Sequence, residues 1–148
     1  MGIRDVDEQE QRIQAVIGHK RLRLKDALKK WHSHLVSHLS LPCEATGIED
    51  FQWEEFYVIG PGSPSEYERL KKNRPSYRDG FELTAIRIEG ESEWIMFPED
   101  LKACVRRKSD GKEFILGLSE LETTSKDSTN CRLLDDYSMW FVDFRQSA

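Results

Sequence analysis

The segment LLDDYSMWF at residues 133–141 places two aliphatic residues, two acids and three aromatic residues within nine positions. On an α-helix, its bulkiest apolar residues fall at i, i+1, i+4, i+7 and i+8, which together form one face: Leu133, Leu134, Tyr137, Trp140 and Phe141. Asp135 and Asp136 lie off that face, at its boundary with water. The pattern predicts a helix from about Arg132 to Phe144 that closes the core of the domain and carries two carboxylates beside it.

The sequence before this helix has the pattern of a small antiparallel sheet. Short apolar runs at residues 81–89, 94–97, 102–107 and 113–118 alternate with turns, and strands at this spacing are typical of a strongly bent sheet or barrel. Asp110-Gly111 supplies the positive φ angles that a hairpin turn requires. Residues 119–122 predict a one-turn element, and residues 123–130 a polar connector.

The N-terminal part of the chain is predicted to be helical. Residues 3–17 form a thinly apolar helix that ends at Gly18. A stronger stripe at helical spacing follows, and Pro42 ends it: Leu24, Leu28, Trp31, Leu35 and Leu39. Residues 1–41 therefore read as a helical arm on an α+β body of residues 42–148. The arm must bury its stripe on that body or on a second copy of the chain, which would give a homodimer.

The first part of the body is less regular. Residues 43–48 predict a short strand, and residues 50–59 mix acids with aromatics and end as a strand. The Gly and Pro residues at positions 60–64 mark a turn. Residues 64–73 then predict a short helix with Ser65 as its N-cap.

The composition argues against a membrane-spanning, secreted or nucleic-acid-binding protein. The longest apolar runs are far short of the roughly 20 residues that span a bilayer, and residues 1–5 lack the apolar core of a secretory signal. Three cysteines without CxxC spacing predict reduced thiols in a cytoplasmic protein: Cys43, Cys104 and Cys131. Residues 1–40 hold 8 Lys/Arg and 5 Asp/Glu, a net of +3, whereas residues 41–148 hold 14 and 22, a net of −8. An acidic body disfavours nucleic acid as the partner and is compatible with a cation.

Two motifs in this order resemble a known family. The run FILGLSELE at residues 114–122 is followed by a polar link and then by LDDYSMWF at residues 134–141. This resembles the C-terminal half of the small cyanobacterial-type calcium-binding protein family, in which a strand ends in a leucine-acidic-leucine step and a DYxxW helix follows. The resemblance covers roughly residues 81–144. It implies a compact, barrel-like α+β fold that holds Ca²⁺ with acidic side chains and catalyses no reaction.

The resemblance does not assign the calcium ligands, and no segment has the spacing of an EF-hand loop. A site must therefore be assembled from separated acids. The candidates are three pairs: Glu49 and Asp50, Glu120 and Glu122, and Asp135 and Asp136. Glu54 and Glu55 belong to the same acidic group as Glu49 and Asp50, and Glu89, Glu91 and Glu93 form a further group in one turn. Each group also has a plainer explanation, as a solvated loop or, for Asp135 and Asp136, as favourable charge near a helix N-terminus.

Two other functions remain open. The first is a metal-independent module that binds a protein or peptide in an aromatic groove on a small barrel, although the same rings would serve equally as core: Trp53, Phe56, Tyr57, Trp94, Tyr137 and Trp140. The second is a metal-dependent hydrolase, since His34 and His38 share a helical face at the i, i+4 spacing of metal ligands. No third ligand or nucleophile accompanies them, so we expect a protein that is not an enzyme.

Overall fold

The computed structural model describes residues 3–125 and 128–147, and its centre is a five-stranded antiparallel sheet. The strands are β1 (Cys43–Gly47), β2 (Phe81–Arg87), β3 (Lys102–Arg107), β4 (Glu113–Gly117) and β5 (Leu121–Thr123). Their order is β4-β3-β2-β1-β5, and every neighbouring pair is antiparallel. Because β4 and β5 stay at opposite edges, the sheet is open. The predicted α+β class is confirmed, and the sheet is not a barrel.

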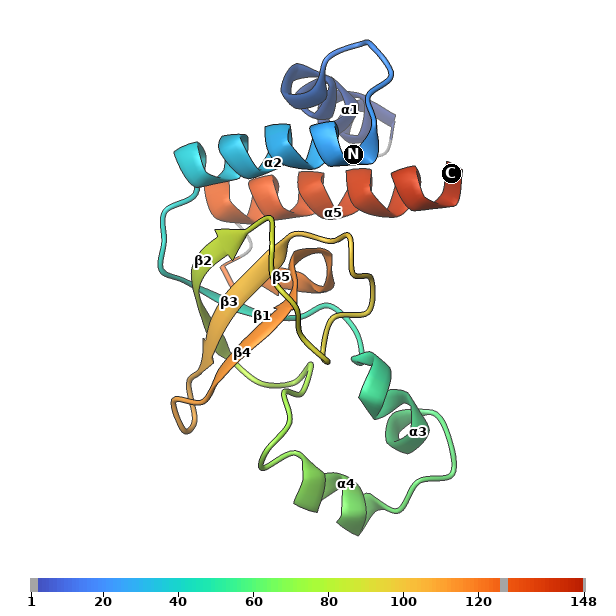
Figure 1. The fold of residues 1–148 in the computed structure, drawn as a ribbon, viewed down its shortest axis with the longest axis vertical. Coiled ribbons are helices and arrows are strands. Elements are labelled where there is room, and N and C mark those ends of the chain that lie inside the picture. Colours follow the sequence, from blue (N-terminus) through green and yellow to red (C-terminus); the bar gives the residue numbers. More distant parts are fainter. Residues whose placement is uncertain (1–2, 126–127, 148) are drawn as a thin grey trace.

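Three helices form a layer over one side of this sheet (Figure 1). They are α1 (Ile3–Ile17), α2 (Leu24–His38) and α5 (Thr129–Ser147). Helices α2 and α5 run side by side in opposite directions, and α1 lies on their outer side. Two shorter helices, α3 (Glu55–Val58) and α4 (Pro64–Leu70), extend from the other end of the molecule. Single 3-10 turns precede α3 and β5: η1 (Gln52–Glu54) and η2 (Leu118–Glu120).

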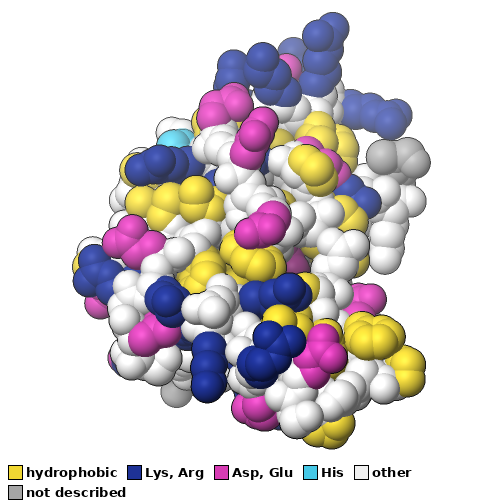
Figure 2. Space-filling model, turned by 60° about the horizontal axis from the view of Figure 1, so that its bottom comes forward, with side chains coloured by type: hydrophobic (Ala, Val, Ile, Leu, Met, Phe, Trp, Pro, Cys, Tyr) yellow, Lys and Arg dark blue, Asp and Glu magenta, His cyan; other side chains and the backbone are white. Residues whose placement is uncertain are grey.

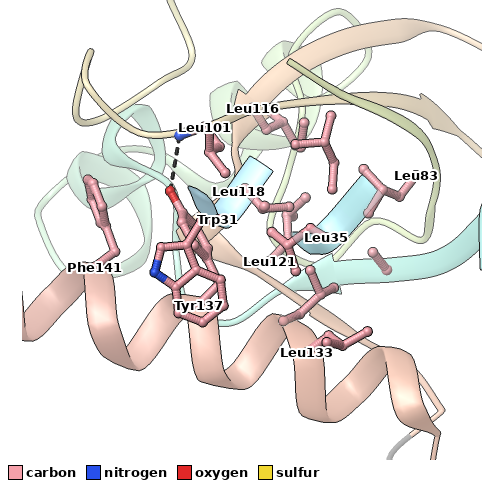
Figure 3. Packing of buried hydrophobic residues seen from close by; sticks show 14 of the residues in the cluster. Trp31, Leu35, Leu83, Leu101, Leu116, Leu118, Leu121, Leu133, Tyr137 and Phe141 are labelled. Atoms are coloured by element: carbon pink, nitrogen blue, oxygen red, sulfur yellow. Dashed lines mark hydrogen bonds between the residues drawn. The ribbon is translucent and has the colours of Figure 1, made fainter. Parts of the chain in front are cut away.

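The core joins the helical layer to the sheet. The α2 stripe meets the apolar face of α5 and the inner sheet residues, so that Trp31, Leu35 and Tyr137 are fully buried (Figure 3). The hydroxyl of Tyr137 accepts a hydrogen bond from Leu101 N at 3.0 Å and donates one to Asp100 Oδ1 at 2.6 Å. The predicted apolar faces of both helices are confirmed. The arm buries its stripe within its own chain.

Several sequence predictions are wrong in detail. Residues 94–97 form turns and bends, because β1 and β4 already occupy both positions beside the β2–β3 pair. Residues 52–58 are helical, since the Glu54 side chain accepts a hydrogen bond from Phe51 N and starts a helical turn there. The N-cap of α4 is Ser63, whose Oγ accepts from Glu66 N, and Pro64 follows at the first helical position. Strand β5 was not predicted, because three residues are too few to show a period.

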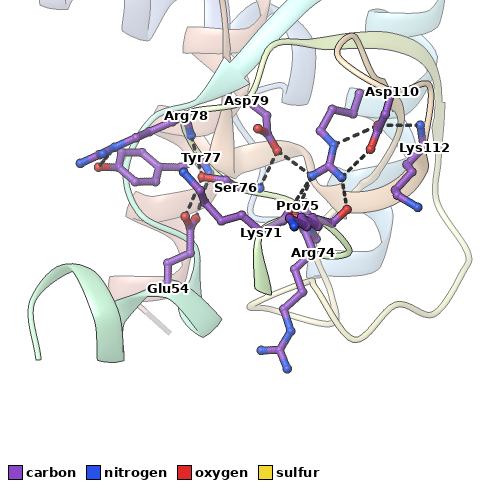
Figure 4. Close-up of polar contacts among 12 residues, drawn as sticks. Glu54, Lys71, Arg74, Pro75, Ser76, Tyr77, Arg78, Asp79, Asp110 and Lys112 are labelled. Atoms are coloured by element: carbon purple, nitrogen blue, oxygen red, sulfur yellow. Dashed lines mark hydrogen bonds and ion pairs between the residues drawn. The ribbon is translucent and has the colours of Figure 1, made fainter. Parts of the chain in front are cut away.

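A second region of the molecule is held by polar contacts. The Glu54 carboxylate is 0% exposed and accepts hydrogen bonds from the backbone and from hydroxyl groups (Figure 4). Its donors are Tyr67 Oη at 2.6 Å, Ser76 Oγ at 2.7 Å, Tyr77 N at 2.9 Å and Phe51 N at 3.1 Å. The Arg107 guanidinium donates to the carbonyl oxygens of Lys71, Lys72 and Arg74 and to two carboxylates, those of Asp79 and Asp110. These contacts tie residues 52–80 to the sheet.

Candidate acidic pocket

Five carboxylates line one pocket of about 600 Å³ between the helical layer and α3. They come from four places in the chain: Glu49 and Asp50 after β1, Glu55 in α3, Glu120 in η2, and Asp135 in α5. We call this site the acidic pocket. Among the described residues, its lining contains no Lys, Arg or His; the other polar side chains are those of Gln9, Ser119 and Ser138. The pocket therefore concentrates negative charge without an internal counter-charge.

Two hydrogen bonds join η2 to the end of β1 and to α5. Ile48 N donates to the backbone oxygen of Glu120 at 2.9 Å, which joins the end of β1 to η2. Ser138 Oγ of α5 donates to the backbone oxygen of Ser119 at 3.3 Å. Segments that are far apart in sequence are thus fixed side by side, and their acids share one space.

Asp100 sets the position of η2. Its carboxylate is 0% exposed and accepts from Ser119 Oγ at 2.6 Å, Ser119 N at 3.1 Å and Tyr137 Oη at 2.6 Å. Burial raises the pKa of Asp100 to about 6, although these hydrogen bonds act in the opposite direction. The sequence reasoning missed this residue, because Pro98-Glu99-Asp100 reads as a turn and nothing in its neighbours predicts a buried acid.

Glu120 lies against Asp100 across Gly117. A Cβ atom on Gly117 would come within 2.7 Å of both Asp100 Oδ2 and Glu120 Oε2, so the close approach of the two carboxylates requires glycine there. Burial, followed by the charges of Asp100 and Glu49, raises the pKa of Glu120 to about 7, against the opposite effect of the N–H groups of Met96 and Gly117. The Met96 N–H lies 3.5 Å from Glu120 Oε2. This carboxylate is held near other negative charges.

The structure separates the six predicted metal ligands. Glu49, Asp50, Glu120 and Asp135 line the acidic pocket. Asp136 is 4% exposed and forms an ion pair with Arg12, whose Nε lies 2.8 Å from Oδ2 and whose Nη2 lies 3.0 Å from Oδ1. Glu122 lies in β5, opposite Thr46. Glu55 joins the pocket, whereas the neighbouring Glu54 serves the polar network of residues 52–80.

The residues behind the two alternative functions are also placed. The aromatic side chains are divided among three locations: Tyr137 and Trp140 lie in the core, Trp94 packs on Phe114, and Trp53 and Tyr57 pack around Tyr67. They do not form one groove. The ring centroids of His34 and His38 are 4.4 Å apart. In the part of the chain that the structure describes, no group of three or more His, Cys, Asp or Glu side chains is close enough to hold a metal ion without rearrangement.

Two solved structures share this fold. The structure of Anabaena CcbP aligns with 91% of this chain and 89% of its own, at a TM-score of 0.57 and 14% identity. A protein described as a calcium-binding protein in the calcium-binding form aligns over 97% of both chains, also at a TM-score of 0.57 and 14% identity. No protein-family model and no curated protein sequence matches the chain.

The resemblance is one of fold. It was expected over residues 81–144 and extends over nearly the whole chain, so the helical arm belongs to the shared architecture. None of the described helices is both long and apolar enough to cross a membrane.

Proposed function

We propose that this chain binds Ca²⁺ in the acidic pocket and catalyses no reaction. The observation that carries the proposal is the lining itself, in which five carboxylates meet no Lys, Arg or His among the described residues. Carboxylates that approach one another repel when ionised, and a bound cation relieves that repulsion. The fold shared with a calcium-binding protein in its calcium-binding form supports the same proposal.

The pocket offers the type of ligand atom that calcium prefers, which is oxygen. The polar side chains of the pocket offer carboxylate, amide and hydroxyl oxygens, which are the ligands of a hard cation, rather than thiol or imidazole. Ca²⁺ accepts six to eight oxygens in flexible geometry, whereas Mg²⁺ requires a near-ideal octahedron. Because the acids are not gathered around one point, binding must draw some of these side chains inward. A flexible cation shell tolerates that adjustment better than a rigid one.

Glu120 makes the binding dependent on pH. Its pKa of about 7 means that a proton competes with the ion for this carboxylate near neutral pH. Between pH 6 and pH 8 its ionised fraction rises by about tenfold. We expect calcium affinity to rise by a similar factor over that range, and we expect Glu120→Gln to remove most of the rise.

Calorimetric titration of chelator-treated protein with Ca²⁺ and Mg²⁺ tests the proposal. We expect heat with Ca²⁺, a raised melting temperature, and an affinity that falls by at least about tenfold in the Glu49→Gln, Glu120→Gln double variant. Glu122→Gln is the matched control, because Glu122 lies in β5 two positions from Glu120 and does not line the pocket. Absence of heat at millimolar Ca²⁺, with an unchanged melting temperature, would contradict the proposal.

A further inference from the structure

Among the described residues, most of the exposed large hydrophobic side chains also lie at the acidic pocket. Eight large hydrophobic side chains are exposed in the described parts of the chain, and five of them line this pocket. They are Ile48, Ile59, Met96, Met139 and Val142, with exposed fractions from 40% to 76%. Figure 2 shows one face of the molecule, on which hydrophobic side chains reach the surface beside Asp and Glu. Clustered exposure of this kind marks an interaction site more often than scattered single residues do.

Helix α5 carries two faces with different roles. Leu134, Tyr137 and Phe141 are fully buried against the core. Asp135, Ser138, Met139 and Val142 follow the i, i+3, i+4, i+7 spacing and line the pocket on a second face. This second stripe is amphipathic in its own right, with its acid at one end and its apolar side chains over the following two turns. The surface it offers is long enough to pack against another helix.

We propose that the acidic pocket is a docking groove for a basic amphipathic helix of a partner protein. Its apolar face would lie on Met139, Val142 and Ile59, and its Lys or Arg side chains would meet the surrounding carboxylates. The charge of the groove selects this partner, because five acids repel nucleic acid and anionic membrane surfaces and attract a cationic segment. The proposal goes beyond calcium binding and does not depend on it.

The geometry favours a helix over an extended peptide. An extended peptide gains its affinity by adding a strand to a free sheet edge. The two sheet edges are β4 and β5, and neither contributes a residue to the pocket lining. The volume of about 600 Å³ is ample for apolar side chains inserted from one helix face. Met96 and Met139 suit such a role, because flexible thioether side chains adapt to different apolar surfaces.

Fluorescence anisotropy with a defined probe tests the docking groove. The probe is a labelled synthetic amphipathic helix of Leu and Lys, about 18 residues long so that it can form a helix. The titration is done in chelator, without Ca²⁺, so that its outcome is separate from that of the calcium proposal. We expect the parent protein to bind this peptide at micromolar concentration. A scrambled peptide of the same composition, whose apolar face is lost, should bind at least about tenfold more weakly.

Variants of the protein locate the binding. Ile59→Gln together with Met139→Gln should lower the affinity for the peptide by at least about tenfold. The melting temperature should stay unchanged, because both side chains are already exposed. Val36→Gln is the matched control, since Val36 is exposed on α2 and does not line the pocket. Equal binding of the scrambled peptide, or full binding by the double variant, would overturn the proposal. So would sedimentation showing that a second copy of the chain fills the groove in a dimer that the double variant abolishes.

Discussion

Glu54 and Glu120 are both carboxylates with little exposure to water, but hydrogen-bond donors surround Glu54 and negative charges lie near Glu120. Glu54 is fully buried and accepts hydrogen bonds from four donors that belong to its own part of the chain. Glu120 is half-buried, and the charges around it are those of Asp100 and Glu49. One carboxylate is supplied with donors by the fold, and the other is placed where its charge is unfavourable. The contrast separates an acid whose charge the fold satisfies with hydrogen bonds from an acid whose charge the fold leaves unfavourable.

The same contrast distinguishes the two polar regions. The Glu54 and Arg107 contacts hold residues 52–80 on the sheet, and each group in them has partners (Figure 4). In the acidic pocket, the Met96 N–H lies 3.5 Å from Glu120, and the described lining residues include no cationic side chain. Proteins tolerate such an unfavourable arrangement chiefly where it serves binding or chemistry. Substitutions in the two regions should therefore have effects of opposite sign.

Removal of the Glu54 carboxylate should have the largest effect on stability. Glu54→Ala leaves four donors without their acceptor, three of them buried, and each unsatisfied buried group costs about 1–3 kcal/mol before water enters. We expect the free energy of unfolding to fall by about 3 kcal/mol, measured by urea denaturation. Glu55→Ala is the control. Its side chain is exposed, so stability should change by less than about 0.5 kcal/mol. An equal loss in the two variants would remove the distinction between the regions.

Neighbouring residues with the same chemistry show where prediction from sequence ends. The helices α2 and α5 could be predicted directly because each buries a regular stripe, whereas the strands β2–β4 were located from short apolar runs between turns. Four of the six candidate ligands also lie in one pocket. Nothing local, however, distinguishes Glu54 from Glu55, since the donors of Glu54 come from residues 51–77 folded around it. The partner of Asp136 is 124 positions away in α1. Such assignments require the tertiary fold.

Neutralisation of Glu120 should change the free energy of unfolding in the opposite direction to Glu54→Ala. The folded chain raises the pKa of Glu120 from 4.5 to about 7, so it binds this proton more tightly than the unfolded chain does. Stability from this group is therefore greatest at low pH and is lost as the pH rises from about 4.5 to about 7. At pH 8 we expect Glu120→Gln to raise the free energy of unfolding by about 2 kcal/mol. The gain should vanish near pH 4.5.

Urea denaturation at pH 5 and pH 8 measures this difference. Asp100, whose pKa is raised to about 6, should leave part of the pH dependence in the Glu120→Gln variant. The variant would then be more stable than the parent and poorer at binding calcium, which is the usual exchange between stability and function at a binding site. A loss of stability at pH 8 would show that Glu120, like Glu54, contributes to the fold through its charge.

The smallest expected effects are those of Asp135 and Asp136, two adjacent acids of α5. One of them is paired within the fold and the other lines the acidic pocket. Asp136→Asn removes the charge that pairs with Arg12, and because Arg12 is partly exposed we expect a loss of about 1 kcal/mol in unfolding free energy with calcium binding unchanged. Asp135→Asn should do the reverse. It should change the free energy of unfolding by less than about 0.5 kcal/mol and lower the calcium affinity severalfold, because Asp135 lines the pocket. Denaturation and calorimetric titration of both variants measure the two quantities side by side. If Asp136→Asn lowered the calcium affinity as much as Asp135→Asn, Asp136 would also be a calcium ligand, and Arg12 would have to release it when calcium binds.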